Sequence, residues 1–142
     1  MDAFEAHLIE QLGSLASAAP AGERPELEAI WNAQVASRQC DHAARYLQPS
    51  GRSFYTIASA GHEGNACVAL ALEPTDPALL HYRSGAFYLA RAAQAGRDGV
   101  PDILSGVTAA RDEPIAGGRH KVFGHPELAI IPQTSTIASH LP

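Results

Sequence analysis

Three adjacent residues at the centre of the chain, His81, Tyr82 and Arg83, have the chemistry to hold an anion. They lie between an apolar run at 78–80 and a helical apolar pattern at 86–95, so they stand just before an expected helix start. Helix N-terminal amides and the planar fork of an arginine both favour phosphate. The simpler alternative is a surface ion pair, and the rest of the chain must decide between the two.

Histidines and cysteines elsewhere do not form a recognisable metal motif. The chain has seven histidines, but none belongs to an HExxH pair, and His120 and His125 have no cysteine nearby. Cys40 and Cys67 form neither a disulfide scaffold nor a zinc pattern. We therefore expect no dedicated transition-metal site.

Composition bounds the class of protein. The 142 residues suffice for one domain with a core, and 46% hydrophobic with 18% charged residues is ordinary for a globular protein. A net charge of −5 without a basic stripe argues against nucleic-acid binding. No apolar run approaches the ~20 residues of a membrane span, and no secretory leader is recognisable. We expect a cytoplasmic protein with no membrane partner.

Apolar spacing predicts two helices in the first third of the chain. The first covers 3–15 and is followed by an Ala/Pro/Gly-rich loop at 16–25. The second begins near Pro25 and stops at the turn 48–51. Its expected inner side is formed by Leu27, Trp31, Val35, Ala43, Ala44 and Leu47. Trp31 is interpreted as a packing anchor.

The remaining elements are shorter. The stretch 52–59 is predicted as a short strand or an extended segment, and 59–72 as a helix buried on nearly every side. Further helices are expected at 85–95, closed by Gly96, and at 101–111. A glycine-rich basic loop at 116–124 precedes a strand at 128–131, a cap at 134–136 and one helical turn to 141.

These elements predict a mainly α fold of about five or six helices with one or two short strands. The chain divides into an N-terminal helix and linker, 1–25, and a main part, 26–142. A strand, a cap and a single turn make a poor domain end, because an isolated turn is unstable. We therefore expect the chain to be the front portion of a larger protein. Helices that would flank a parallel sheet there would pack on each other here, and their exposed apolar faces would favour a homo-oligomer.

Five ordered motifs between 30 and 142 resemble one enzyme family. The motifs are Gly51–Tyr55, Ser59–Glu63, Tyr82–Arg83, Gly118–Arg119 and Thr134–Pro142. In this order they resemble the thiamine-diphosphate-dependent, transketolase-like dehydrogenase components (E1) of the 2-oxo acid dehydrogenase complexes, those acting on branched-chain 2-oxo acids, pyruvate or related substrates. The part resembled is the front of their α-type half, so the implied fold is the front part of a thiamine-diphosphate-binding α/β fold.

The resemblance implies roles for matching positions. Tyr82 and Arg83 correspond to the pair that grips the cofactor diphosphate, while Ser135 and Ile137 fall in the segment that contacts the cofactor. Gly118 and Arg119 match a substrate-side loop that commonly carries a histidine. That histidine is shifted here, which leaves His120 and His125 as alternative proton-transfer candidates. In some relatives a structural potassium ion lies at the positions of Thr134, Thr136, Ser139 and His140, where Thr136 replaces a proline and His140 an amide-type residue.

The implied cofactor is thiamine diphosphate with Mg, whose ligands lie in a Gly-Asp-Gly motif that this sequence lacks. The implied partners are the remainder of the α half, the β half and a lipoyl-bearing acyltransferase. We therefore expect the 142 residues alone to be inactive and to bind the cofactor only weakly. The alternative is a catalytically silent helical module used for association or regulation.

Overall fold

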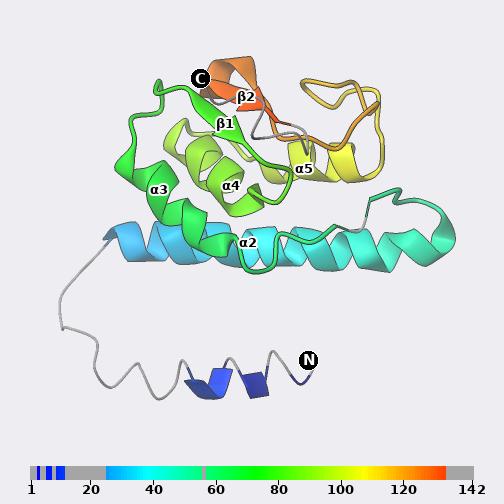
Figure 1. Cartoon of the computed structure of the whole chain (residues 1–142), viewed down its shortest axis with the longest axis horizontal. Helices are drawn as coiled ribbons and strands as arrows, with labels where there is room; N and C mark the ends of the chain where they lie inside the picture. Colours follow the sequence, from blue (N-terminus) through cyan, green and yellow to red (C-terminus); the bar gives the residue numbers. More distant parts are fainter. Residues whose placement is uncertain (1–2, 4–5, 8, 12–24, 56, 134–142) are drawn as a thin grey trace.

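The computed structural model describes residues 3, 6–7, 9–11, 25–55 and 57–133. Its longest helix, α2 (Pro25–Leu47), runs along one side of the molecule (Figure 1). Glu26 and Glu28 lie in its first turn and Arg45 in its last, as the helix dipole favours. The helix ends in the short turn η1 (Gln48–Ser50) and at Gly51, whose φ of 69° is in the left-handed region. The predicted start and stop of this helix are confirmed.

The predicted inner side of α2 is wrong at its start, whereas Ala44 is buried as predicted. Leu27 and Trp31 are 52% and 58% exposed, so Trp31 is not a packing anchor. The buried side consists of small or short residues further along the helix, namely Ala33, Ser37, Cys40, Asp41 and Ala44. Small side chains on this face allow α4 to approach closely, and a Cβ added to Gly85 would lie 2.7 Å from the Ser37 Oγ. Close helix approach, rather than bulk, therefore selects the buried face.

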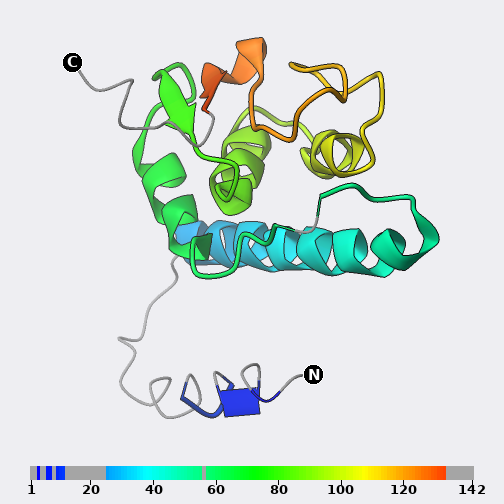
Figure 2. The same cartoon turned by 45° about the vertical axis from the view of Figure 1, so that its right-hand side comes forward.

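Helix α4 (Gly85–Gln94) is the central element. It lies between α2 on one side and the strands β1 (Ala78–Leu80) and β2 (Ile130–Pro132) on the other (Figures 1 and 2). Every residue from Gly85 to Ala92 is buried. The helix stops where Gly96 adopts a φ of 69°, which confirms the predicted closing residue.

The two strands pair in parallel. Ala78 faces Ile130, Leu79 faces Ile131 and Leu80 faces Pro132. The crossover between them contains α4 and α5 (Val100–Val107), since parallel strands cannot be joined by a tight turn. Parallel pairing has one consequence for function: both strands finish at the same edge of the sheet.

Arg91 fixes the opposite edge. Arg91 belongs to α4, and its side chain is fully buried. Its Nη1 donates to the carbonyl oxygens of Pro74, Asp76 and Leu128 at 2.9–3.3 Å. These three carbonyls precede β1 and β2 in the chain. Burial lowers the pKa of Arg91, and Asp76 opposes that effect. One guanidinium thus holds together the segments that enter both strands.

Two other predicted elements differ from the structure, and the stretch 52–59 takes one of its two predicted alternatives. The described residues of 52–59 form no strand, so this stretch follows the extended-segment alternative; Phe54 is 67% exposed and its amide donates to the Val107 carbonyl. The predicted helix 59–72 is reduced to the turn η2 (Glu63–Asn65) and α3 (Ala66–Ala71), and it is not buried all round because Val68 is 53% exposed. Helix α5 stops at Val107 rather than at 111, since Ala109 adopts a φ of 53°.

The end of the described chain is shifted as well. Leu128 belongs to the turn η3 (Pro126–Leu128), so β2 begins at Ile130, two residues later than predicted. The predicted cap at 134–136 and the turn at 137–141 lie outside the described residues, as does most of the predicted helix 3–15, of which residues 3, 6–7 and 9–11 are helical. The part of the chain that the structure describes is mainly helical with two short parallel strands. None of its helices is both long and apolar enough to span a membrane.

Candidate functional site

The residues His81 to Ser84 form the turn that connects the end of β1 to the start of α4. The Ser84 amide donates to the His81 carbonyl at 2.9 Å, and the Arg83 amide donates to the His81 Nδ1 at 3.3 Å. Asn65, far away in the sequence, caps the helix, because its Oδ1 accepts from the Phe87 amide at 3.1 Å. We call 81–84 the anion turn. It combines a strand end, a helix N-terminus and an arginine.

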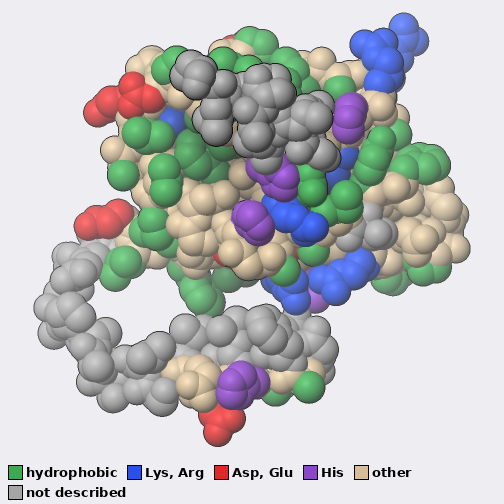
Figure 3. Space-filling view, viewed as in Figure 1, with side chains coloured by type: hydrophobic (Ala, Val, Ile, Leu, Met, Phe, Trp, Pro, Cys, Tyr) green, Lys and Arg blue, Asp and Glu red, His purple; other side chains and the backbone are tan. Residues whose placement is uncertain are grey.

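Cationic and aromatic side chains gather at the anion turn. The His81 ring lies 3.7 Å from the Tyr82 ring and 6.1 Å from the His62 ring, measured between centroids, and the Arg83 guanidinium lies 5.4 Å from the Tyr82 centroid. Figure 3 shows histidine and basic side chains together on one face. Burial lowers the pKa of His81, and the charges of His62, Arg83 and Lys121 lower it further. A site that disfavours another positive charge is suited to a negative one.

Arg83 is anchored to the extended segment 52–59. Its Nη1 donates to the Ala58 carbonyl at 2.5 Å, and the amide of the next residue, Ser59, donates to the Asp41 Oδ2 at 2.8 Å. Guanidinium has five N–H donors, and among the described residues the Ala58 carbonyl is the one hydrogen-bond acceptor for that of Arg83. One nitrogen of Arg83 is therefore held by the extended segment 52–59.

Lys121 approaches the anion turn from the glycine-rich loop. It is 8% exposed, its Nζ donates to the Tyr82 carbonyl at 3.1 Å, and the same Nζ lies 4.9 Å from the centroid of the Phe123 ring. Burial lowers the pKa of Lys121, whereas the Asp41 carboxylate raises it. The pKa of Asp41 is raised by burial, against the effects of the Ser59 amide and Lys121. Each of the two charges thus eases the burial of the other.

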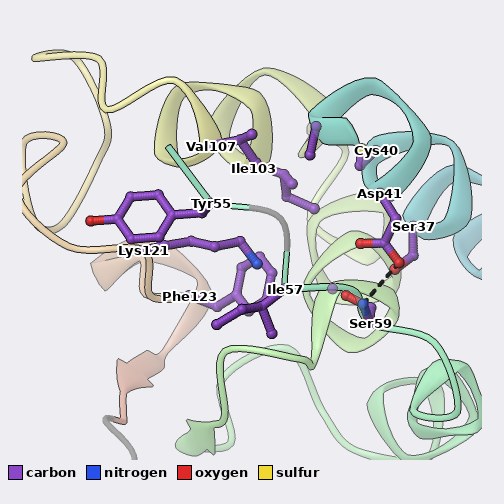
Figure 4. Close-up of a pocket in the computed structure, with 12 residues that line it drawn as sticks. Ser37, Cys40, Asp41, Tyr55, Ile57, Ser59, Ile103, Val107, Lys121 and Phe123 are labelled. Carbon is purple, nitrogen blue, oxygen red and sulfur yellow. Dashed lines mark hydrogen bonds between the residues drawn. The ribbon is translucent and has the colours of Figure 1, made fainter. Parts of the chain in front are cut away.

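Asp41 and Lys121 line one small cavity (Figure 4). It contains about 10 Å³ of room for the centre of a water-sized sphere, which is space for about one water. Ser37 lines the cavity too and is 1% exposed. Its Oγ has no hydrogen-bond partner among the described residues. A cavity of this size accommodates no organic substrate; it separates a buried acid from a buried base.

Sequence reasoning missed Asp41, Lys121 and Asn65. The signal for Asp41 is its position in a helical stripe of small buried residues, with Ser37 one turn before it. The signal for Lys121 is its place next to the apolar pair Val122 and Phe123. Neither signal is specific without knowing which face of α2 is buried.

The predicted substrate-side residues lie on the same loop as Lys121 but are exposed or structural. Gly118 has a φ of 72°, and a Cβ there would collide with the Ala109 carbonyl and lie 2.5 Å from the Ala110 oxygen. Arg119 and His120 are exposed. None of the three has a hydrogen bond to the anion turn; Lys121 makes that connection.

His125, the other proton-transfer candidate, lies near the start of β2. It is 7% exposed; its Nδ1 accepts from the Glu127 amide at 3.2 Å, and its Nε2 lies 3.2 Å from the Arg97 Nη2. The His125 backbone also pairs with Ile130. Both ring nitrogens therefore have protein contacts, which favours a structural role at this end of the sheet.

The other predicted site residues lie outside the described part of the chain. These are Ser135 and Ile137 for the cofactor, and Thr134, Thr136, Ser139 and His140 for potassium. Within the described residues, histidine, cysteine and acidic side chains do not gather in threes as a metal site requires.

Comparison with known proteins leaves the chain unassigned. No family model matches it, and neither a curated protein nor a solved structure is significantly similar. The function must therefore be argued from the anion turn and its surroundings.

Proposed function

We propose that the chain is the N-terminal segment of a thiamine-diphosphate-dependent 2-oxo acid dehydrogenase component, and that the anion turn holds the diphosphate. The observation that carries the proposal is the parallel pairing of β1 and β2. In open sheets of parallel strands, ligands bind beyond the carboxyl ends of adjacent strands. Here β1 ends at Leu80 and leads into Tyr82 and Arg83. Its register partner on β2, Pro132, leads into the sequence that contains Ser135 and Ile137.

The donors of the anion turn fit a diphosphate. Within the described residues Arg83 bonds only the Ala58 carbonyl through its side chain, Tyr82 has a phenolic hydroxyl, and His81 gains a proton more readily once an anion is near. These groups would bind and orient the phosphates. When bound, the thiazolium ring of the cofactor supplies the electron sink for decarboxylation of the 2-oxo acid. The lipoyl disulfide of the acyltransferase partner would accept the acyl group together with the two electrons of the oxidation.

The isolated chain is expected to be a weak binder without activity, because the Gly-Asp-Gly motif for the Mg ligands is not in its sequence. Two charge-assisted hydrogen bonds of about 2 kcal/mol each correspond to a dissociation constant of about 1 mM for the diphosphate group. Micromolar binding of thiamine diphosphate by the isolated chain, or turnover of a 2-oxo acid with an artificial electron acceptor, would contradict this expectation.

The test is inorganic pyrophosphate binding, followed by NMR at low salt. We expect the signals of the anion turn to shift with a dissociation constant of about 1 mM, and the shifts to be lost in Arg83→Gln. Arg97→Gln is the matched control, since Arg97 bonds Glu127 away from the anion turn and should leave binding unchanged. Equal binding by the wild type and Arg83→Gln would refute the proposal.

A second candidate is the catalytically silent association module. It is favoured by the exposed apolar side chains of Leu27, Trp31, Leu79 and Ile131. Reading the native coding frame onward separates the two: a Gly-Asp-Gly motif with its later Asn supports the enzyme, whereas an immediate stop supports the module.

A further inference from the structure

Asp41 and Arg83 hold the two ends of one peptide group. The peptide between Ala58 and Ser59 donates its N–H to the Asp41 carboxylate at 2.8 Å and accepts from the Arg83 Nη1 through its C=O at 2.5 Å. A peptide group is planar and rigid, so fixing its N–H end also fixes the direction of its carbonyl. The position of the Arg83 guanidinium therefore depends on Asp41, although the two side chains do not touch.

Lys121 acts on the neighbouring peptide of the anion turn. Its Nζ bonds the Tyr82 carbonyl, which belongs to the peptide that joins Tyr82 to Arg83. Asp41 thus acts on the Arg83 side chain through the Ala58–Ser59 peptide, and Lys121 acts on the Arg83 backbone through the Tyr82 carbonyl. Both residues are more than nine-tenths buried.

We propose that Asp41 and Lys121 are positioning residues for the anion turn, which fix the Arg83 fork in the orientation that receives a phosphate. The identity of the anion rests on the proposed function. The positioning of Arg83 by Asp41 and Lys121 does not depend on it. Neither residue is expected to touch the ligand. Their opposite buried charges stabilise each other across the small cavity. The other cations that act on them are Arg38 and Arg45 on Asp41, and Arg83 on Lys121.

Coulomb's law and positioning predict opposite effects at Asp41. Replacing the acid by Leu removes a negative charge close to a cationic site, so electrostatics alone would tighten anion binding. If Asp41 acts by positioning, Asp41→Leu should weaken pyrophosphate binding, on the order of fivefold. Asp41→Asn keeps an acceptor for the Ser59 amide and should bind at least as tightly as the wild type.

A ligand-free measurement tests the geometry by itself. The order parameter of the Arg83 Nε–H group, from ¹⁵N relaxation, should fall in Asp41→Leu and be retained in Asp41→Asn. Asp102→Leu is the matched control: Asp102 accepts the Tyr88 hydroxyl at 2.7 Å away from the turn, so the loss of this acceptor should lower stability without changing the order of Arg83. Failure of the wild type to bind pyrophosphate would refute the proposed function only, because the Arg83 measurement still decides the present inference.

A variant at Asp41 could lose Arg83 order because it fails to fold rather than because Arg83 is no longer positioned. Asp41→Leu leaves the buried Lys121 without its acid, which can prevent folding. In that case Lys121→Met and the double variant Asp41→Leu with Lys121→Met provide the comparison, since the double variant has no uncompensated buried charge. Each should disorder Arg83 in a folded chain. Unchanged Arg83 order in any folded variant without the Asp41 acceptor would overturn the proposal.

Discussion

His81 stands out at the scale of single residues because burial and three basic side chains act on its pKa. Burial lowers its pKa first, followed by the charges of His62, Arg83 and Lys121. A base whose folded pKa lies below its unfolded value of 6.5 contributes stability that is fully present above that value. This contribution is lost as the pH falls through the folded pKa. An anion at the turn would offset the same repulsion and raise the pKa of His81.

Anion binding should therefore be coupled to proton uptake at His81. We expect the affinity of the wild type for pyrophosphate to gain more on acidification below pH ~6.5 than the affinity of His81→Asn does. Comparing the two proteins in calorimetric titrations over a pH series cancels the titration of pyrophosphate itself. Parallel pH profiles would show that His81 does not sense the anion.

At this scale the sequence indicated the turn at 81–84 as a candidate site, but not the residues that support it. Tyr82 and Arg83 were recognisable because adjacent hydroxyl and guanidinium groups before a helix start are a local pattern. Asp41 acts through a hydrogen bond to Ser59, and Lys121 through the Tyr82 carbonyl. Such long-range partners are fixed by tertiary packing, which no local pattern contains.

At the scale of elements, the glycine-rich loop contains a left-handed glycine, Gly118, that can be compared with Gly51 at the end of α2. Gly51 and Gly118 have φ values of 69° and 72°, but a Cβ at Gly51 meets nothing within 4 Å, whereas one at Gly118 collides with the Ala109 carbonyl. Gly118 therefore lets the loop lie directly on the end of α5. That contact is what carries Lys121 toward the anion turn.

We expect Gly51→Ala to cost about 1 to 2 kcal/mol, the price of a left-handed alanine. Gly118→Ala should cost about 1 to 3 kcal/mol more, because backbone atoms must move to relieve the collision. Urea unfolding of both variants measures the difference. Equal losses of unfolding free energy would show that the loop yields without resistance.

Among the elements, the helix ends marked by Pro25, Gly51 and Gly96 were predictable, whereas the end of α5 and the buried face of α2 were not. Pro25, Gly51 and Gly96 mark helix ends by backbone chemistry that acts within a few residues. The buried side of α2 depends instead on which neighbour comes close, and Gly85 of α4 selects the small residues there. The stretch 52–59 has strand-like composition but pairs with α5 and Asp41 rather than with a strand.

For the whole molecule, the outer face of the sheet is its most exposed apolar feature with a defined register. Leu79 and Ile131 face each other across the strands and are 56% and 48% exposed. Within the described residues, only β1 and β2 form the sheet, so each strand has one edge without a neighbouring strand. Such an edge and face are suited to association with another chain.

We expect the chain to self-associate, and Leu79→Lys together with Ile131→Lys to reduce that association. Sedimentation velocity over a range of concentrations measures it. Tyr46→Lys is the control, because Tyr46 is 84% exposed but lies on α2. A wild type that sediments as a monomer at every concentration would contradict the prediction.

The three carbonyls that Arg91 holds have a consequence for the order of events during synthesis. Pro74 and Asp76 precede Arg91 in the chain and are available as soon as α4 forms, whereas Leu128 is translated much later. Until then the guanidinium is bonded to the approach to β1 alone, and β2 has not been made. Because non-local parallel pairing is slow to form, the sheet edge beside the anion turn should be the last of the described parts of the nascent chain to acquire its structure.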